Sequence, residues 1–176
     1  MEVIYEDNHI IIVNKAVGEI VQGDRTGDIP LVETVRQYIK EKYAKPGNVF
    51  CGVVHRLDRP VGGLVVFAKT SKALARLNEM FREGKIKKTY WAITRGCPAE
   101  ESARLEGYIT SVERNNKSYY SLSPSDGAKR AALSYRLLAR GERYNLLEVN
   151  LETGRKHQIR VQLASIGCPI KGDLKY

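Results

Sequence analysis

The chain has 176 residues, with 29 basic and 20 acidic side chains. Its formal charge of +9 favours a polyanionic partner, although a basic protein with no nucleic-acid role fits this charge as well. Its three cysteines form no C-x-x-C pair, which argues against a disulfide framework or a zinc site and predicts a cytoplasmic protein without a metal. No apolar run approaches the ~18 residues of a membrane span, and a chain of this length is most simply one domain.

The first part of the chain alternates short strands with amphipathic helices. We expect three strands, at residues 3–5, 9–14 and 64–68. Apolar residues at helical spacing predict a helix over 31–44, which Pro46 and Gly47 end. Thr70 or Ser71 is expected to cap a second helix that runs to about Glu83. Four apolar residues would form the inner face of this helix: Leu74, Leu77, Met80 and Phe81.

From Thr89 onward the pattern is mostly strands separated by turn residues. The expected strands are 90–94, 105–109, 119–122, 131–139 and 144–151. Ile159, Leu163 and Ile166 mark a last helix, which Gly167 ends. Many strands with few helices indicate an α+β fold, in which a bent mixed, largely antiparallel sheet carries helices on its faces.

One segment, His55-Arg56-Leu57-Asp58-Arg59-Pro60, sets a single carboxylate between two arginines. Glycines and an apolar strand follow it, so Asp58 is expected on a loop beside a rigid strand, where it can act on a ligand. The neighbouring guanidinium groups would stabilise its negative charge. The alternative is a surface aspartate paired with Arg56 or Arg59, a kind of contact worth only ~0–1 kcal/mol.

A second segment, Thr153 to Val161, places cationic and amide donors before another apolar element. Lys156, His157 and Arg160 would share roughly one face of the last helix. The two segments together indicate a nucleophile with cationic surroundings for a phosphodiester substrate. The alternative is a solvated basic face near the start of a helix.

These segments resemble the signature of the RluA family of pseudouridine synthases. Besides the HRLD loop and the GR-x-HQIR segment, three further stretches match the family: Ile10–Lys15, Lys88–Ala92 and Gly167–Tyr176. The chain departs from the family pattern at a few positions: Ala16, Gly62, Lys156, Gln162 and Cys168. The resemblance implies one pseudouridine synthase catalytic domain over 1–176, with no S4-like domain before it and without the further strands that the family normally adds after it.

The resemblance also implies an activity, the isomerisation of uridines in tRNA or rRNA to pseudouridine, without a cofactor. Asp58 would be the catalytic carboxylate, and whether it attacks C1′, attacks C6 or abstracts the C2′ proton stays open. Tyr90 would stack on the target uracil, Arg160 would form a salt bridge with Asp58, and Ile170 would form the floor of the base pocket. Six residues are candidates for RNA contacts: Arg56, Arg59, Lys88, Arg155, Lys156 and His157. We expect a monomer whose partner is a structured RNA stem-loop.

Three other classes of protein fit parts of this sequence. A non-catalytic RNA-binding module would keep the basic groove and would not need Asp58. A glycoside or nucleoside hydrolase usually needs two carboxylates ~5–9.5 Å apart, and neither segment offers a second one. A small basic ribosomal scaffold would need neither Tyr90 nor Arg160 near Asp58.

Overall fold

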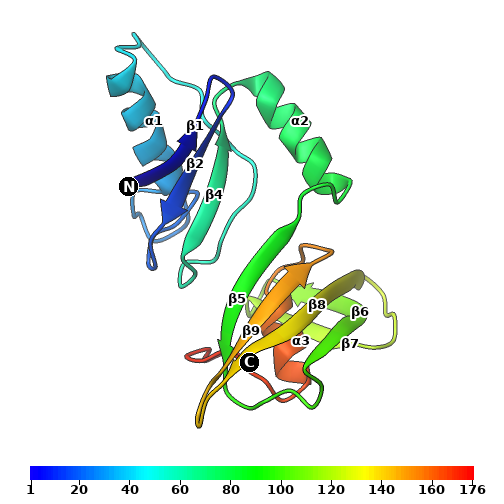
Figure 1. The fold of residues 1–176 in the computed structure, drawn as a ribbon. Helices are drawn as coiled ribbons and strands as arrows, with labels where there is room; N and C mark the ends of the chain where they lie inside the picture. The colour runs from blue at the N-terminus through cyan, green and yellow to red at the C-terminus, as the bar shows by residue number, and fades with distance from the viewer. The chain divides into compact units, whose positions relative to one another are not determined.

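The computed structural model describes residues 1–176 and divides into two compact units, Met1–Lys85 (unit 1) and Ile86–Tyr176 (unit 2). Each unit combines an antiparallel sheet with helix, so the predicted α+β class is confirmed (Figure 1). The strands are divided between the two sheets, one in each unit. None of the three helices has both the length and the apolar character needed to cross a lipid bilayer.

Unit 1 contains a four-stranded sheet in the order β1-β2-β4-β3 and two helices. Its elements are β1 (Glu2–Glu6), β2 (Ile10–Lys15), α1 (Leu31–Lys42), β3 (Gly52–Val53), β4 (Gly63–Ala68) and α2 (Ser71–Arg82). The strands and helices expected here are confirmed, and β3 is an addition. A strand of two residues carries no periodic pattern, which explains why the sequence did not indicate it.

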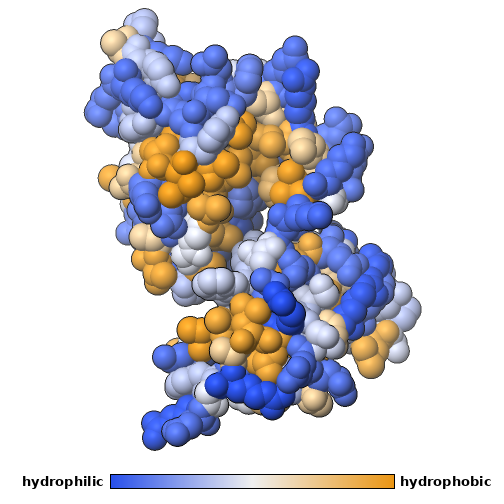
Figure 2. Space-filling view, viewed as in Figure 1, coloured by the Kyte–Doolittle hydropathy of each residue, from blue (hydrophilic) through white to orange (hydrophobic).

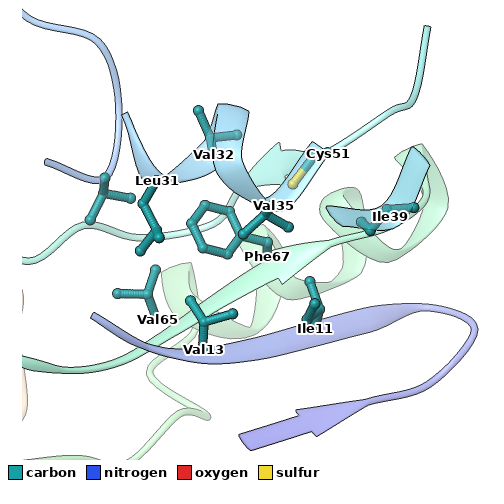
Figure 3. Packing of buried hydrophobic residues seen from close by; sticks show 10 residues of the cluster. Ile11, Val13, Leu31, Val32, Val35, Ile39, Cys51, Val65 and Phe67 are labelled. Carbon is teal, nitrogen blue, oxygen red and sulfur yellow. The ribbon is translucent and has the colours of Figure 1, made fainter. Parts of the chain in front are cut away.

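The core of unit 1 lies between α1 and one face of the sheet (Figure 3). Alternate residues of β2 and β4 point into it and meet the apolar stripe of α1. Its central members are at most 5% exposed: Ile11, Val13, Leu31, Val32, Val35, Ile39, Val65 and Phe67. The side chains between them point to the other face, where Ile4 and Leu64 are half exposed. Apolar surface gathers over unit 1 in Figure 2.

Helix α2 begins as expected, because the Thr70 hydroxyl accepts a hydrogen bond from the Ala73 N–H at 3.1 Å. Its predicted inner face is only partly correct. Met80 is exposed, and Ala73 is the buried residue of the helix. Leu74 approaches β3 so closely that a Cβ at Gly52 would lie 2.8 Å from its Cδ2 atom.

Unit 2 contains a five-stranded antiparallel sheet in the order β5-β9-β8-β6-β7 and one helix. Its elements are β5 (Lys88–Thr94), β6 (Ser102–Val112), β7 (Lys117–Ser121), β8 (Lys129–Arg140), β9 (Asn145–Leu151) and α3 (Gln158–Ser165). All five predicted strands and the last helix are confirmed. Helix α3 packs on the sheet through Leu163, which is fully buried with residues of three neighbouring strands, β5, β9 and β8: Ala92, Leu133, Leu147 and Val149.

Candidate active site

Asp58 lies in the loop that joins β3 to β4, and it is exposed. The loop contains a turn, because the Val61 N–H donates to the Asp58 carbonyl oxygen at 3.0 Å. Gly63 begins β4 with φ at +134°, which side chains other than glycine rarely adopt, so the strand entry requires a glycine. Directly after it, Val65 and Phe67 are fully buried. The loop thus presents an acidic side chain to solvent from a firmly packed strand.

His55 fastens the start of this loop. Its Nε2 atom accepts a hydrogen bond from the Val66 N–H of β4 at 3.1 Å. Its ring stacks on Phe81 of α2, with the ring centroids 5.2 Å apart and the planes at 23°. The two contacts tie the imidazole ring of His55 to the backbone of β4 and to a side chain of α2, so His55 has a structural role here. No group of three or more His, Cys, Asp or Glu residues lies together in a way that could hold a metal ion.

Lys15, the last residue of β2, fastens the end of the loop. Its side chain is buried, with 1% of the residue exposed. The ammonium donates to three carbonyl oxygens, those of Val61 at 2.6 Å, Ala16 at 3.0 Å and Arg59 at 3.2 Å. Burial lowers the pKa of Lys15, and the negative charge of Glu19 partly offsets this effect.

The two arginines beside Asp58 have different surroundings. The Arg59 guanidinium donates to Asp28 at 2.7 Å and to Asp24 at 3.3 Å. The hydrogen bond from Arg59 holds the pKa of Asp28 below its usual value. Arg56 is exposed and has no ion pair. Arg59 is therefore engaged with the loop that precedes α1, and Arg56 is the more accessible of the two.

Tyr90 and Ile170 both lie in unit 2 and pack against the same buried cluster. Tyr90 is half-buried on β5, where it pairs with Val149 of β9. Ile170 forms an isolated antiparallel bridge with Thr94 at the other end of β5. Their positions are thus fixed by the core of unit 2.

Arg160 lies in the first turn of α3 and binds a carboxylate that the sequence had not singled out. Its Nε and Nη2 atoms donate to the two carboxylate oxygens of Asp173, at 2.5 and 2.7 Å. Burial alone would raise the pKa of Asp173, but the hydrogen bonds from Arg160 and from the Lys175 N–H hold it below its usual value. The guanidinium also lies over the ring of Tyr176, 5.0 Å from its centroid. The predicted pair of Arg160 with Asp58 would join the two units and stays a prediction.

The prediction that Lys156, His157 and Arg160 share one helical face is wrong. Helix α3 begins only at Gln158, and His157 precedes it with a left-handed backbone, φ +56°. This conformation interrupts the helical spacing, so Lys156 and His157 leave the line of the helix. The His157 Nδ1 atom instead lies 2.7 Å from the hydroxyl oxygen of Tyr176.

Gln158 organises the loop before α3. It is 3% exposed, and its Oε1 atom accepts from the Thr153 hydroxyl at 2.8 Å and from the Arg155 N–H at 2.9 Å. Its Nε2 atom donates to the Ala132 carbonyl oxygen at 3.0 Å. A buried amide with its partners satisfied holds a loop in one conformation. The backbone of this segment is therefore fixed, while the side chain of Lys156 is exposed.

Lys88 and Arg155 bring two positive charges together in unit 2. Burial lowers the pKa of Lys88, and the charge of Arg155 lowers it further. A Cβ atom at Gly154 would lie 3.7 Å from the Lys88 Nζ atom, so the loop before α3 passes close to this amine. Neither cation has a carboxylate partner. An anionic group at this point would relieve their mutual repulsion.

The chain matches the model of the RNA pseudouridylate synthase family over residues 9–165, which includes parts of both units. The chain belongs to this family. Among curated relatives, ribosomal large subunit pseudouridine synthase D of Zymomonas mobilis is 36% identical and is covered over 56% of its length, with 100% of this chain aligned. The tRNA pseudouridine synthase C of Vibrio parahaemolyticus is 34% identical, with 100% of this chain and 73% of the relative aligned.

A solved structure, human RNA pseudouridylate synthase domain containing 4, has the same fold, with a TM-score of 0.85 and 27% identity over 99% of this chain and 68% of that one. The resemblance to the RluA family is confirmed by the relatives named as synthases C and D. The chain spans about half the length of several curated relatives, such as 57% of the YhcT protein of Bacillus subtilis.

Sequence reasoning missed three residues that shape the site: Lys15, Gln158 and Asp173. Each lies within a stretch that carries the family resemblance, and that was the available signal. Their partners are distant in sequence, since Lys15 binds a carbonyl 46 positions away and Gln158 one 26 positions away. Pattern and spacing do not reveal such contacts.

Proposed function

We propose that this chain carries the catalytic region of an RNA pseudouridine synthase, which isomerises uridines in tRNA or rRNA to pseudouridine. Membership of the family supports this activity. One observation supports the assignment of this activity to Asp58. This residue is exposed, and its loop is held at one end by His55 and at the other by Lys15. Fixed position and access to solvent are what a group that acts on a large substrate needs.

The reaction breaks the N1–C1′ bond of a uridine and joins C1′ to C5 of the same uracil, after which C5 loses its proton to N1 or to solvent. Asp58 is the carboxylate that we assign to the covalent or proton-transfer step. Tyr90 offers a ring that stacks on uracil and a hydroxyl that exchanges a proton. Arg160 is assigned to hold Asp58, and Ile170 to support the base.

The target nucleotide must leave its stack to reach Asp58, at a cost of a few kcal/mol. Cationic contacts to the RNA backbone offset this cost. Arg56 is the accessible cation beside Asp58, and in unit 2 the exposed Lys156 and the pair of Lys88 with Arg155 are suited to phosphates. Arg59 already binds two carboxylates, which makes it a weaker candidate.

Tritium release from [5-³H]uridine-labelled tRNA and rRNA pools tests the proposal. The wild-type chain is expected to release tritium, and Asp58→Ala should lower the rate by at least about 10³-fold while binding the same RNA within about twofold. Asp126→Ala is the matched control, because Asp126 is exposed on a turn of unit 2. No release by the wild type from any pool, with RNA still bound, would favour a non-catalytic RNA-binding module. Equal release by Asp58→Ala would remove Asp58 from its role.

The proposal includes a monomer that acts in the cytoplasm on structured RNA. Sedimentation of the chain with and without a tRNA transcript measures the stoichiometry. A single chain per transcript is expected, and a stable dimer in the absence of RNA would contradict the monomer.

A further inference from the structure

Unit 1 has a groove that takes no part in the proposed reaction. It lies between α1 and the segment that leads into β3, and its volume of about 650 Å³ is within the ~300–1,000 Å³ of small-molecule sites. We call it the α1 groove. Six residues determine its chemical character: Arg36, Lys40, Asn48, Val49, Phe50 and Cys51.

The α1 groove forms because the chain reverses direction where α1 ends. The Lys45 N–H donates to the Lys40 carbonyl oxygen at 3.0 Å, and Gly47 has φ at +72°, a left-handed conformation that glycine adopts without strain. The segment after Gly47 therefore returns beside α1. At its far end, the Arg36 guanidinium donates to the Cys51 carbonyl oxygen at 3.3 Å, and the Cys51 side chain is buried beside α1 (Figure 3).

Phe50 differs from its neighbours in the α1 groove. Val49 and Cys51 pack against the core of unit 1, whereas Phe50 is 45% exposed. A phenylalanine ring in this position contributes little to the core. An exposed ring can stack on any nucleobase, because every base has a flat π-face.

The α1 groove also carries positive charge. Its single carboxylate, that of Glu33, forms an ion pair with Arg36. Lys40 is exposed and has no ion pair, so no carboxylate compensates its charge. The exposed amide of Asn48 has both donors and an acceptor for a base edge. The groove thus combines a cation, an amide and an aromatic ring, which are the groups that bind the phosphate, the edge and the face of an unpaired nucleotide.

The α1 groove and the Asp58 loop lie at opposite ends of β4. The groove leads into β3, whose Gly52 pairs with Ala68 at the end of β4, whereas the Asp58 loop enters this strand at Gly63. The six residues of β4 span ~17 Å, which corresponds to roughly five stacked nucleotides at ~3.4 Å each. One RNA molecule can therefore contact both places.

We infer that the α1 groove is a second contact site for the RNA substrate, in which Phe50 stacks on an unpaired base and Lys40 binds a neighbouring phosphate. The inference rests on the proposed function, which supplies RNA as the ligand. The groove adds affinity and touches no reacting atom, because the length of β4 separates it from Asp58. RNA is favoured over a protein segment because the groove offers one ring beside uncompensated charge, whereas the centre of a protein interface is apolar and depleted in charge.

The experiment compares Phe50→Ala, Phe50→Leu and Phe50→Trp in their affinity for a fluorescein-labelled tRNA transcript, measured by anisotropy. Phe50→Ala should weaken binding about tenfold, and Phe50→Leu nearly as much, because leucine is apolar but has no ring to stack. Phe50→Trp should bind at least as tightly as the wild type. Ile29→Ala is the matched control and should change nothing, because Ile29 is an exposed apolar residue of the same unit outside the groove.

Two further measurements separate this contact from catalysis. Lys40→Gln should weaken binding about threefold and lower the slope of log K against log salt by about 0.7, as expected for one phosphate of a single strand. Lys72→Gln, at an exposed position of α2, is its control. In tritium release, Phe50→Ala should raise the apparent KM about tenfold and keep kcat within about twofold, because the lost contact is equal in the ground state and the transition state.

The outcomes decide between RNA and another occupant of the α1 groove. Wild-type affinity in folded Phe50→Ala overturns the inference. Wild-type affinity in Phe50→Leu beside a loss in Phe50→Ala also overturns it, because a contact of that kind needs only apolar volume, as a protein segment does. If Phe50→Ala does not fold, Phe50→Leu and Lys40→Gln decide by the same values.

Failure of the proposed function gives a different result from failure of this inference. In that case the wild type releases no tritium, and the order of RNA affinities among the Phe50 variants still tests the α1 groove. A wild type that releases tritium, together with Phe50 variants that keep its affinity and KM, would leave the proposed function intact and overturn the inference. A wild type that binds no RNA overturns the inference as well.

Discussion

The two units hold their candidate residues in different ways. In unit 1, Lys15 and His55 fasten the Asp58 loop through backbone atoms, namely the carbonyls that Lys15 binds and the Val66 N–H that His55 binds. In unit 2 the candidate Arg160 is held by another side chain, that of Asp173. When a side chain of the loop is replaced, the backbone groups that Lys15 and His55 bind are still present. When one member of a side-chain pair is replaced, the other member loses a partner.

This difference indicates where function can be separated from stability. Asp58 and Arg56 are exposed, and the turn around them uses backbone atoms, so their replacement should leave unit 1 folded. Arg160 is mostly buried with Asp173, so its replacement removes a proposed functional group and also leaves a buried charge unpaired. A loss of activity in an Arg160 variant therefore needs a stability measurement beside it.

The strongest test of the comparison is Asp173→Ala. The Asp173 side chain is 4% exposed and that of Arg160 is 22% exposed, so the variant removes a carboxylate that forms two hydrogen bonds with a largely buried guanidinium. We expect the free energy of unfolding of unit 2 to fall by about 3 kcal/mol. Urea unfolding followed by the fluorescence of Trp91, the single tryptophan, reports on β5 of this unit.

Asp126→Ala is the control for this experiment and should change the free energy of unfolding by less than about 0.5 kcal/mol, because Asp126 is exposed. The double variant Asp173→Ala/Arg160→Met should be more stable than Asp173→Ala, since it also removes the largely buried positive charge. Equal stability of Asp173→Ala and the wild type would mean that the pair does not hold α3.

Unit 1 also has a largely buried side-chain network, which is centred on Glu6. Burial alone would raise the pKa of Glu6, but hydrogen bonds from Lys42, Lys69, Tyr43 and Tyr38 lower it from 4.5 to about 2. The Glu6 and Lys69 side chains are each 6% exposed, so solvent screens this contact little. Glu6→Gln should reduce the free energy of unfolding by about 2 kcal/mol at neutral pH.

The pH dependence separates this network from the rest of the molecule. The folded pKa of Glu6 is below the unfolded one, so its contribution is complete above about pH 4.5 and is lost as the pH falls toward 2. The difference between the wild type and Glu6→Gln should therefore shrink over that interval. Urea titrations followed by methyl NMR signals of Ile11 and Val13 measure it in unit 1. A difference that stays constant from pH 7 to 2 would contradict the role of the Glu6 carboxylate.

Much of the fold could be predicted from local pattern. The helix predicted over residues 31–44 is present and ends at Lys42. The cap at Thr70 could also be identified, because a capping side chain and the N–H groups that it binds lie within one helical turn. The division of the strands between two sheets was not predicted from the sequence, because it depends on contacts between distant segments. The exposure of Met80 was also missed, because helical spacing alone does not show how much of a helix face its neighbours cover.

The candidate site was predictable in its residue types and less so in its contacts. The HRLD segment indicated an exposed acid on a loop before a strand, and the structure has this arrangement. A lysine is rarely buried, so the role of Lys15 could not be read from its type. The left-handed backbone of His157 has no marker in the sequence, because glycine or asparagine would be the usual residue there.

The smallest effect separates the two arginines beside Asp58. Arg56 is exposed without an ion pair, whereas Arg59 binds Asp24 and Asp28, which offset its charge. In the proposed function Arg56→Gln should lower the affinity for a tRNA transcript about fivefold and reduce the slope of log K against log salt by about one, as expected for one lost phosphate contact. Arg59→Gln should change the affinity less than twofold. Fluorescence anisotropy over a series of salt concentrations measures both, and equal losses would mean that RNA displaces Asp24 and Asp28 from Arg59, so that the loop before α1 also rearranges on binding.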